Sequence, residues 1–168
     1  WTAGPFELPE PIRAGWDARP RGSALEADWQ TRFDAYAQAF PGEAGEFVRR
    51  VAGDLPEAFV TALSALGQAL ADNLPAEATR QSSQRTLNAL APALPELLGG
   101  SADLTDSNKT HWKGAVVFGP QQPAGQYLHY GVREFAMAAA MSGMALHGGV
   151  IPFGGTFLFS IPSHHRRV

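Results

Sequence analysis

One acidic residue stands at the start of an otherwise apolar helical pattern. In HYGVREFAMAAAMSGMALHGG, residues 129–149, Glu134 follows a glycine turn and an arginine, and mostly alanine and methionine come after it. A carboxylate at the rim of a buried helix must be paired, protonated or in use, so Glu134 is a candidate acid–base group. The ordinary alternative is that an acidic residue in the first turn complements the helix dipole, worth about 0.3–1 kcal/mol.

Two upstream segments carry polar side chains that can contact a ligand. GGSADLTDSN, residues 99–108, has small residues that permit close backbone approach, followed by Asp103, Ser107 and Asn108. A plain turn explains the same residue types. ATRQSSQ, residues 78–84, places Arg80 at a helix start. The alternative for Arg80 is a solvated surface arginine.

The sequence shows neither the residue spacing of a metal site nor a nucleotide-binding glycine loop. His129, His147, His164 and His165 lack the spacing of metal ligands, so we assign no metal site. The sequence contains no Walker-type or G-x-G-x-x-G loop. These observations direct attention to Glu134 and the two polar segments.

The first 75 residues are expected to be helical and connecting. Residues 1–24 are rich in proline, glycine and charge, which predicts an irregular linker or an arm that crosses the surface. Apolar spacing predicts two helices in residues 25–50, broken at Pro41, and another in residues 55–72. We place a domain boundary after residue 75.

The rest of the chain alternates helices and strands. We expect helices at 77–91 and 134–147, strands in LPELLGG, YLHYG and GVIPFGGTFLF, and a loop at 106–126. Met137, Met141 and Met144 form a stripe that predicts core packing, and the many alanines predict a helix buried on most sides. The fold class is therefore α/β, a helical linker followed by part of a parallel sheet with crossover helices. Ligands bind such sheets at the carboxyl ends of the strands.

Composition limits the function classes. Of 168 residues, 45% are apolar and 17% charged, which is enough to fill a core. The net charge of -3 offers no basic field for nucleic acid. No apolar run reaches the roughly 18–20 residues that span a bilayer. The lack of cysteine fits a reducing compartment, and we expect a cytoplasmic protein with no nucleic-acid or membrane partner.

Several motifs together resemble the transketolase family. GGSADLTDSNKT, YLHYGVREFAM, GMALHGG and PFGGTFLF occur in that family's order and at roughly its spacing. PFELPEPIRAGWD, AFPGEAGEFVRR and LPEAF resemble the segment that joins the family's two large domains. The resemblance covers about residues 1–159.

The resemblance implies a thiamine diphosphate site. The matching glutamate, Glu134, would hydrogen-bond a ring nitrogen of the aminopyrimidine and so promote loss of the thiazolium C2 proton. It also implies roles for other residues: Asp103, Leu104, Phe157 and Phe159 near the cofactor, and Arg80 and Ser107 on the phosphate of a sugar substrate. The implied reaction transfers a two-carbon ketol unit from a ketose phosphate to an aldose phosphate.

The resemblance also implies parts that lie elsewhere. Residues 1–75 would be the linker or the end of a preceding domain, which would hold the diphosphate and the ligands of Mg²⁺. Residues 76–168 would be an incomplete pyrimidine-binding domain of a homodimeric parent enzyme. The ending FLFSIPSHHRRV departs from the family, because Phe159 comes one residue early and Pro162 interrupts the expected helix.

Three interpretations are consistent with the sequence. The chain is the central segment of a transketolase of the pentose phosphate pathway, inactive by itself. It is alternatively a truncated, non-catalytic piece that serves in dimerisation. A dihydroxyacetone synthase-like enzyme shares the same motifs.

Overall fold

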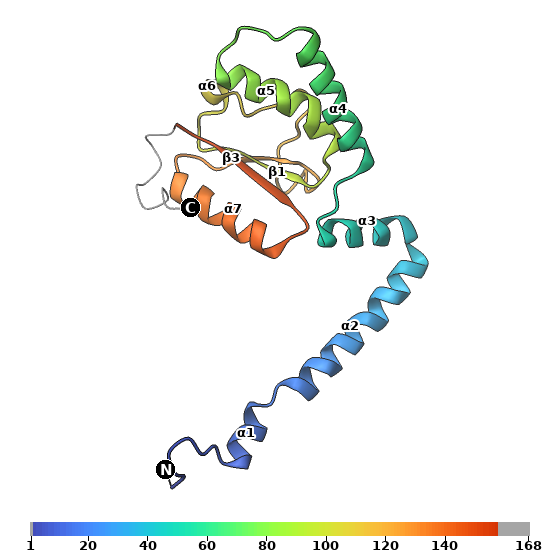
Figure 1. Cartoon of the computed structure of the whole chain (residues 1–168), viewed down its shortest axis with the longest axis vertical. Coiled ribbons are helices and arrows are strands. Elements are labelled where there is room, and N and C mark those ends of the chain that lie inside the picture. Colours follow the sequence, from blue (N-terminus) through green and yellow to red (C-terminus); the bar gives the residue numbers. More distant parts are fainter. Residues whose placement is uncertain (1, 158–168) are drawn as a thin grey trace. The chain divides into compact units, whose positions relative to one another are not determined.

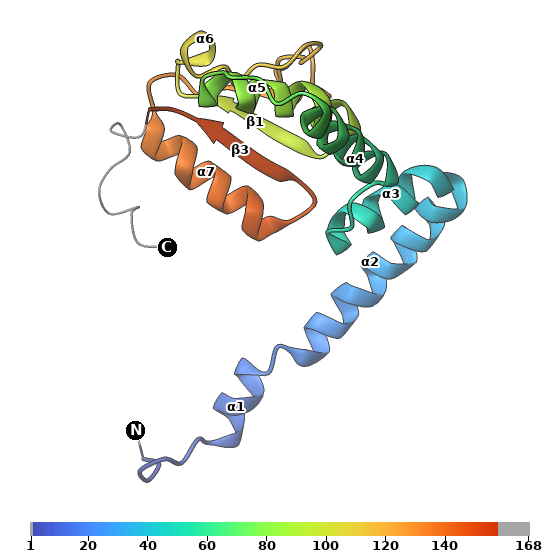
Figure 2. The ribbon, with the colours of Figure 1, turned by 45° about the horizontal axis from the view of Figure 1, so that its top comes forward.

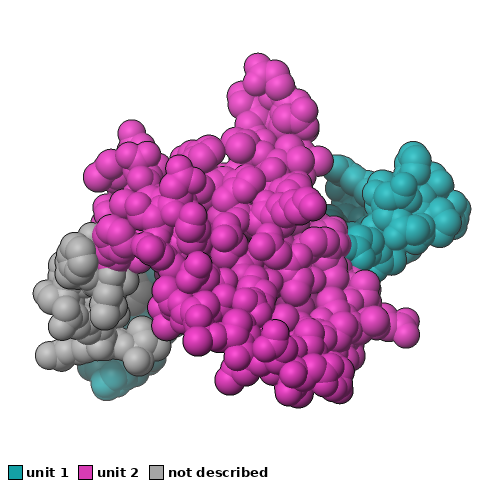
Figure 3. Space-filling view, turned by 90° about the horizontal axis from the view of Figure 1, so that it is seen from above, with its two compact units in different colours: residues 1–47 teal, residues 48–168 magenta. Residues whose placement is uncertain are grey.

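The chain is divided into two compact units. The computed structural model describes residues 2–157, and Figure 3 colours the two units, residues 1–47 and 48–168. The first unit contains helices and connecting segments. The second contains a small sheet with helices on both faces, and every residue of the candidate site belongs to it.

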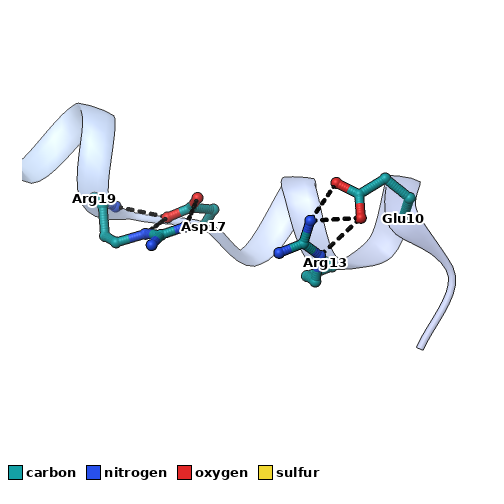
Figure 4. A network of polar contacts seen from close by, with 4 residues as sticks. All are labelled: Glu10, Arg13, Asp17 and Arg19. Carbon is teal, nitrogen blue, oxygen red and sulfur yellow. Dashed lines mark hydrogen bonds and ion pairs between the residues drawn. The ribbon is translucent and has the colours of Figure 1, made fainter. Parts of the chain in front are cut away.

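The N-terminal segment is helical, so the prediction of an irregular linker over residues 1–24 was wrong. The helices are α1 (Glu10–Trp16) and α2 (Arg19–Ala39), each with a proline in its first turn, where proline is well tolerated. Arg13 pairs with Glu10 one turn away at 2.7 Å, and Arg19 pairs with Asp17 at 2.6 Å (Figure 4). The Glu10–Arg13 pair, three residues apart, favours helix α1. Asp17 lies just before α2 and accepts the amide of Arg19 at 3.1 Å, which satisfies one of the free donors at the start of that helix.

Pro41 separates two helices, as the sequence predicted. Helix α2 ends at Ala39 and α3 (Pro41–Ala52) begins at the proline. The aromatic stripe of α2 is formed, because Trp29 stacks on Phe33 with ring centroids 5.1 Å apart. Phe33 also contacts Phe47 of α3 at 5.6 Å.

Three parallel strands form the sheet of the second unit, and this confirms the predicted α/β class. They are β1 (Leu97–Ser101), β2 (Tyr127–His129) and β3 (Ile151–Gly155), in the order β2-β1-β3. Ser101 is in register with His129 on one side and with Gly155 on the other. The carboxyl ends of all three strands therefore meet at one edge.

Helices cover both faces of this sheet. The covering helices are α4 (Glu57–Asp72), α5 (Thr79–Leu90) and α7 (Glu134–His147), with a 3₁₀ turn at Ala91–Ala93; the one-turn α6 (Thr105–Asn108) lies in the loop after β1. Figures 1 and 2 show α7 on one face and α4 and α5 on the other. A buried cluster of Ala91, Leu94, Leu97, Trp112 and Tyr127 fills the space on the α5 side.

Gly99 and Gly100 allow the strands to approach one another. A Cβ on Gly99 would collide with the carbonyl oxygen of Phe153 in β3, and one on Gly100 with that of Leu128 in β2. The sequence suggested that these glycines admit a ligand. In the structure they are buried inside the central strand, and their close neighbours are its two partners.

Helix α7 packs on the sheet along its methionine stripe. A Cβ on Gly154 would lie 2.5 Å from the sulfur of Met141 and 2.9 Å from that of Met137. The expected burial on most sides is wrong for this chain, because Phe135 is 58% and Leu146 89% exposed. The reason is that only one side of the helix meets the three described strands.

No helix in residues 2–157 combines the length and the apolar character that crossing a membrane requires.

Candidate functional site

The candidate residues follow the carboxyl ends of the three strands. The loop after β1 carries Asp103 and Leu104, the turn after β2 leads to Glu134, and Thr156 and Phe157 come directly after β3. This is the edge where parallel α/β sheets bind their ligands.

An open pocket of about 430 Å³ lies at this edge. It brings together three predicted site residues, since Arg80, Ser107 and Phe157 all line it. The other lining residues are Ala78, Thr79, Ser83, Asn108 and Thr156. Arg80 Nη1 donates a hydrogen bond to the carbonyl oxygen of Ser107 at 3.2 Å, so helix α5 and the α6 turn are joined at the pocket.

Glu134 is held at the start of α7 by a tight turn. Gly131 has a φ of 67°, a conformation that favours glycine. The amide of Arg133 donates to the carbonyl oxygen of Gly131 at 2.7 Å, and Arg133 Nη1 donates to that of Tyr130 at 3.1 Å. The Thr156 hydroxyl donates to Glu134 Oε1 at 3.4 Å, which links the partly buried carboxyl to the end of β3.

Asp103 has an uncommon backbone conformation. Its φ of 63° lies in the left-handed region, which aspartate tolerates better than most residues. The next amide, that of Leu104, donates to Ser101 Oγ at 3.0 Å and so fixes the turn. Neither Asp103 nor Leu104 is among the pocket-lining residues. Phe159 lies outside the described residues.

Tyr130 was not predicted from the sequence. Its hydroxyl is buried and has no hydrogen-bond partner within residues 2–157. Burial raises the pKa of the Tyr130 hydroxyl, which keeps it protonated and able to donate at neutral pH. The sequence feature that could have identified Tyr130 is its position between β2 and the turn that leads to Glu134.

Thr156 and Ser83 were also missed. Thr156 occupies the first position after β3, and Ser83 lies one turn along α5 from the start at which Arg80 was noted. Within the described ranges, no group of three acidic or histidine side chains is placed to hold a metal ion.

Comparison with protein families gives two matches along the chain. The model described as the transketolase pyrimidine binding domain matches residues 76–159, which include the sheet and the pocket. The model described as the transketolase thiamine diphosphate binding domain matches residues 1–56.

Individual proteins and structures agree with these matches. The chain is 55% identical to the chromosomal transketolase of Cupriavidus necator, over 94% of the chain and 23% of that protein. It is 48% identical to transketolase 2 of Escherichia coli K12, over 96% of the chain and 24% of that protein. A mutant transketolase of Pichia stipitis, solved with fructose 6-phosphate, superposes with a TM-score of 0.75 at 36% identity, over 93% of the chain and 24% of that structure. The chain thus spans about a quarter of the length of these relatives.

Proposed function

The chain belongs to the transketolase family, and from this premise we propose that it forms the pyrimidine-binding side of a thiamine diphosphate-dependent transketolase site. The reaction moves a two-carbon ketol unit from a ketose phosphate to an aldose phosphate. The proposal rests on what the structure brings together at the carboxyl ends of the strands. A pocket there is lined by Arg80, Ser107 and Phe157, and Thr156 holds the Glu134 carboxyl beside it.

The residues present fit the cofactor by their chemistry. Glu134 offers a carboxyl that can share a proton with a weakly basic ring nitrogen. Phe157 offers an aromatic face at the pocket, where an aromatic ring stacks favourably. When bound, thiamine diphosphate supplies the electron sink that stabilises a two-carbon fragment.

Each of the proposed site residues of this chain would have a separate role. Glu134 would hold a proton at its carboxyl, and the Thr156 hydroxyl would keep that carboxyl in place. Arg80 would bind the phosphate of the sugar through charge-assisted hydrogen bonds. Because the Ser107 carbonyl takes only one of its N–H groups, further guanidinium donors remain for a phosphate.

Other parts of the proposal concern the parent protein. We propose that Mg²⁺ is bound by residues outside this segment, that the enzyme is a homodimer, and that it works in the cytoplasm in the pentose phosphate pathway. Residues 1–75 and 76–168 stay our proposed domain division. The 168 residues alone are expected to be inactive and to bind thiamine diphosphate weakly, because the chain covers only about a quarter of its relatives.

A chimera provides the direct test. Residues 1–157 would replace the matching segment of the Cupriavidus necator chromosomal transketolase, and this protein is called the chimera below. We expect it to bind thiamine diphosphate and to transfer two-carbon units from fructose 6-phosphate to an aldose phosphate. A chimera that folds but neither binds the cofactor nor transfers the unit would contradict the proposal and support the non-catalytic interpretation. The isolated chain, titrated with thiamine diphosphate and Mg²⁺ by calorimetry, is the matched comparison.

A further inference from the structure

Five polar side chains form a continuous hydrogen-bonded row beneath the loop that follows β1. They are Thr105, Tyr127, Thr110, Asn108 and Ser101, called the hydroxyl row below. Tyr127 and Ser101 are fully buried, and Thr110 is 7% exposed. Each of the five has a polar side-chain atom, and the ring of Tyr127 also belongs to the apolar core, so the buried polar atoms of the row have to be matched by hydrogen bonds.

The direction of each bond in the first half follows from counting hydrogens. Thr110 donates its single hydroxyl hydrogen to Asn108 Oδ1 at 3.1 Å. It must therefore accept from the Tyr127 hydroxyl, 2.8 Å away. Tyr127 has then used its only hydrogen and must accept from Thr105, also at 2.8 Å.

The second half continues in the same direction. Asn108 Nδ2 donates to Ser101 Oγ at 3.0 Å, and Ser101 donates to the carbonyl oxygen of Gly155 at 3.0 Å. Ser101 Oγ also accepts the amide of Leu104 at 3.0 Å. The hydroxyl row thus runs one way from α6 to the end of β3.

The row joins the parts of the site that the proposed function needs at a fixed spacing. Both contacts are made by Ser101 Oγ at the end of the row: it accepts the amide of Leu104, next to Asp103, and donates to the carbonyl oxygen of Gly155. Gly155 precedes Thr156, which donates to Glu134. Bonds aligned in one direction in a buried place strengthen one another, and the loss of one leaves a buried group unsatisfied.

We propose that the Tyr127 hydroxyl is a positioning group that sets the spacing between the Asp103–Leu104 loop and the Glu134–Thr156 end of the site. Tyr127 lines no part of the pocket, so it acts through the row and not by contact with a ligand. The proposal rests on the proposed function for the identity of the cofactor. The aromatic ring of Tyr127 has a separate role, since it packs against Trp112 in the core with ring centroids 6.0 Å apart.

Tyr127→Phe in the chimera separates the two roles, because it keeps the ring and removes the oxygen. We expect the dissociation constant of thiamine diphosphate to rise about tenfold, the effect of one unsatisfied buried hydrogen bond. Turnover at saturating cofactor should stay within about threefold, because Glu134 keeps its own partner. In cofactor-free protein, hydrogen exchange at the Leu104 amide should become faster by about tenfold.

Thr110 offers a second, matched pair of variants. Thr110→Val keeps the shape and removes the hydroxyl, and it should reproduce the effects of Tyr127→Phe. Thr110→Ser keeps the hydroxyl and should restore cofactor affinity. The double variant Tyr127→Phe/Thr110→Val should be little worse than either single variant, because both changes break one row. Tyr36→Phe, at a 41% exposed tyrosine of the other unit, is the control and should change neither readout.

The outcomes distinguish this inference from the proposed function. If the unchanged chimera binds no thiamine diphosphate, the proposed function is wrong. The positioning role is then tested only by the rate of hydrogen exchange at the Leu104 amide. If the chimera binds the cofactor and Tyr127→Phe changes neither its affinity nor the exchange rate, the positioning role is refuted. A lower melting temperature with both readouts unchanged would also refute it, since that result describes only a structural contact. If Tyr127→Phe fails to fold, the Thr110 pair decides.

Discussion

Thr156 Oγ1 donates a hydrogen bond to Glu134 Oε1 at 3.4 Å, across 22 positions of sequence. The contact joins the first residue after β3 to the first residue of α7, the helix that leads into that strand. It is long for a hydroxyl hydrogen bond, so its contribution belongs at the low end of about 0.5–1.5 kcal/mol. Its importance is geometric, because it places a carboxyl at the edge of the pocket that Thr156 lines.

Glu134→Gln in the chimera should reduce turnover far more than it weakens cofactor binding. Glutamine has the shape of glutamate but cannot share a proton as a carboxyl does. Groups in acid–base catalysis typically contribute about 10²–10⁴-fold, and we expect a loss in this range. Turnover at saturating cofactor and calorimetric titration measure the two effects separately. Near-normal turnover in a fully loaded variant would remove Glu134 from the proposed role.

Thr156→Val should have a smaller effect of the same kind. Removing one long hydrogen bond is expected to lower turnover about two- to fivefold, because Glu134 then samples other positions. Thr156→Ser keeps the hydroxyl and is the matched control, with turnover close to that of the parent chimera. If valine and serine lower turnover equally, the side-chain methyl matters more than the hydrogen bond to Glu134.

Gly100→Ala should destabilise the sheet. The added Cβ would collide with the backbone of Leu128 in β2, and backbone cannot move aside as a flexible side chain can. Such overpacking typically costs about 1–3 kcal/mol, which thermal unfolding of the chimera would detect. Gly67→Ala, in helix α4 with nothing within 4 Å of the added carbon, is the control. It should leave the melting temperature unchanged or raise it slightly. Equal effects of the two changes would contradict the packing role of Gly100.

The helices and strands of the second unit could be predicted because the spacing of apolar residues and the positions of glycine and proline indicate the same elements. The helix expected at 134–147 has those bounds in the structure, and the strands expected around LPELLGG, YLHYG and GVIPFGGTFLF all form. Pro41 likewise separates two helices as predicted. In each case an apolar stripe or run is bounded by glycine, proline or polar residues.

The N-terminal helices and the hydroxyl row could not be predicted from the same signals. Proline and glycine in residues 1–24 suggested a linker, but the prolines occupy first turns and local ion pairs support the helices. The hydroxyl row depends on β2 meeting the loop after β1. Sequence separation hides this pairing, since Thr105 and Tyr127 are 22 positions apart. Pairing between Arg80 and the Ser107 backbone, 27 positions apart, was hidden in the same way.

Glu96→Gln should lower the free energy of unfolding at neutral pH. It should also make that free energy change less as the pH falls. Glu96 is 4% exposed and takes two hydrogen bonds from Arg49, at 2.9 and 3.0 Å. Burial alone would raise the pKa of Glu96, but hydrogen bonds from Arg49 and the backbone and the charges of Arg49 and Arg50 outweigh it. The pKa therefore lies below its ordinary value of 4.5. A lowered carboxyl pKa stabilises the fold above the unfolded-state value, and this contribution is lost as the pH falls below about 4.5.

Thermal midpoints of the chimera from pH 7 to pH 3.5 measure this effect. Removing one partner of a buried ion pair costs about 3–5 kcal/mol, and we expect the low end because Arg49 keeps 19% exposure. The parent midpoint should fall more steeply than that of Glu96→Gln below pH 4.5. Asp28→Asn, which breaks an exposed pair with Arg32, should change little. Parallel pH curves for Glu96→Gln and the parent would contradict the assigned role of the pair.

Arg80→Ala should weaken the binding of phosphorylated sugars. Each charge-assisted hydrogen bond from a guanidinium to a phosphate is worth roughly 1.5–3 kcal/mol. Arg80 and Ser107 belong to α5 and α6, whereas the proposed cofactor contacts Glu134 and Phe157 belong to α7 and to the segment after β3. KM for phosphorylated substrates should therefore rise at least tenfold, with a smaller effect on kcat, and cofactor affinity should barely change.

Substrates without phosphate supply the control for Arg80. A donor and an acceptor that both lack phosphate have no group for the guanidinium to bind, so their kcat/KM should be nearly equal in the parent chimera and in Arg80→Ala. Arg80→Lys should recover part of the lost affinity, because it restores the charge without the planar pair of donors. The competing role for Arg80 is support of the pocket wall through its bond to the Ser107 carbonyl, and loss of that support would lower kcat/KM for both substrate classes alike. Equal loss with phosphorylated and unphosphorylated substrates would therefore assign Arg80 to the support of the loop and not to phosphate recognition.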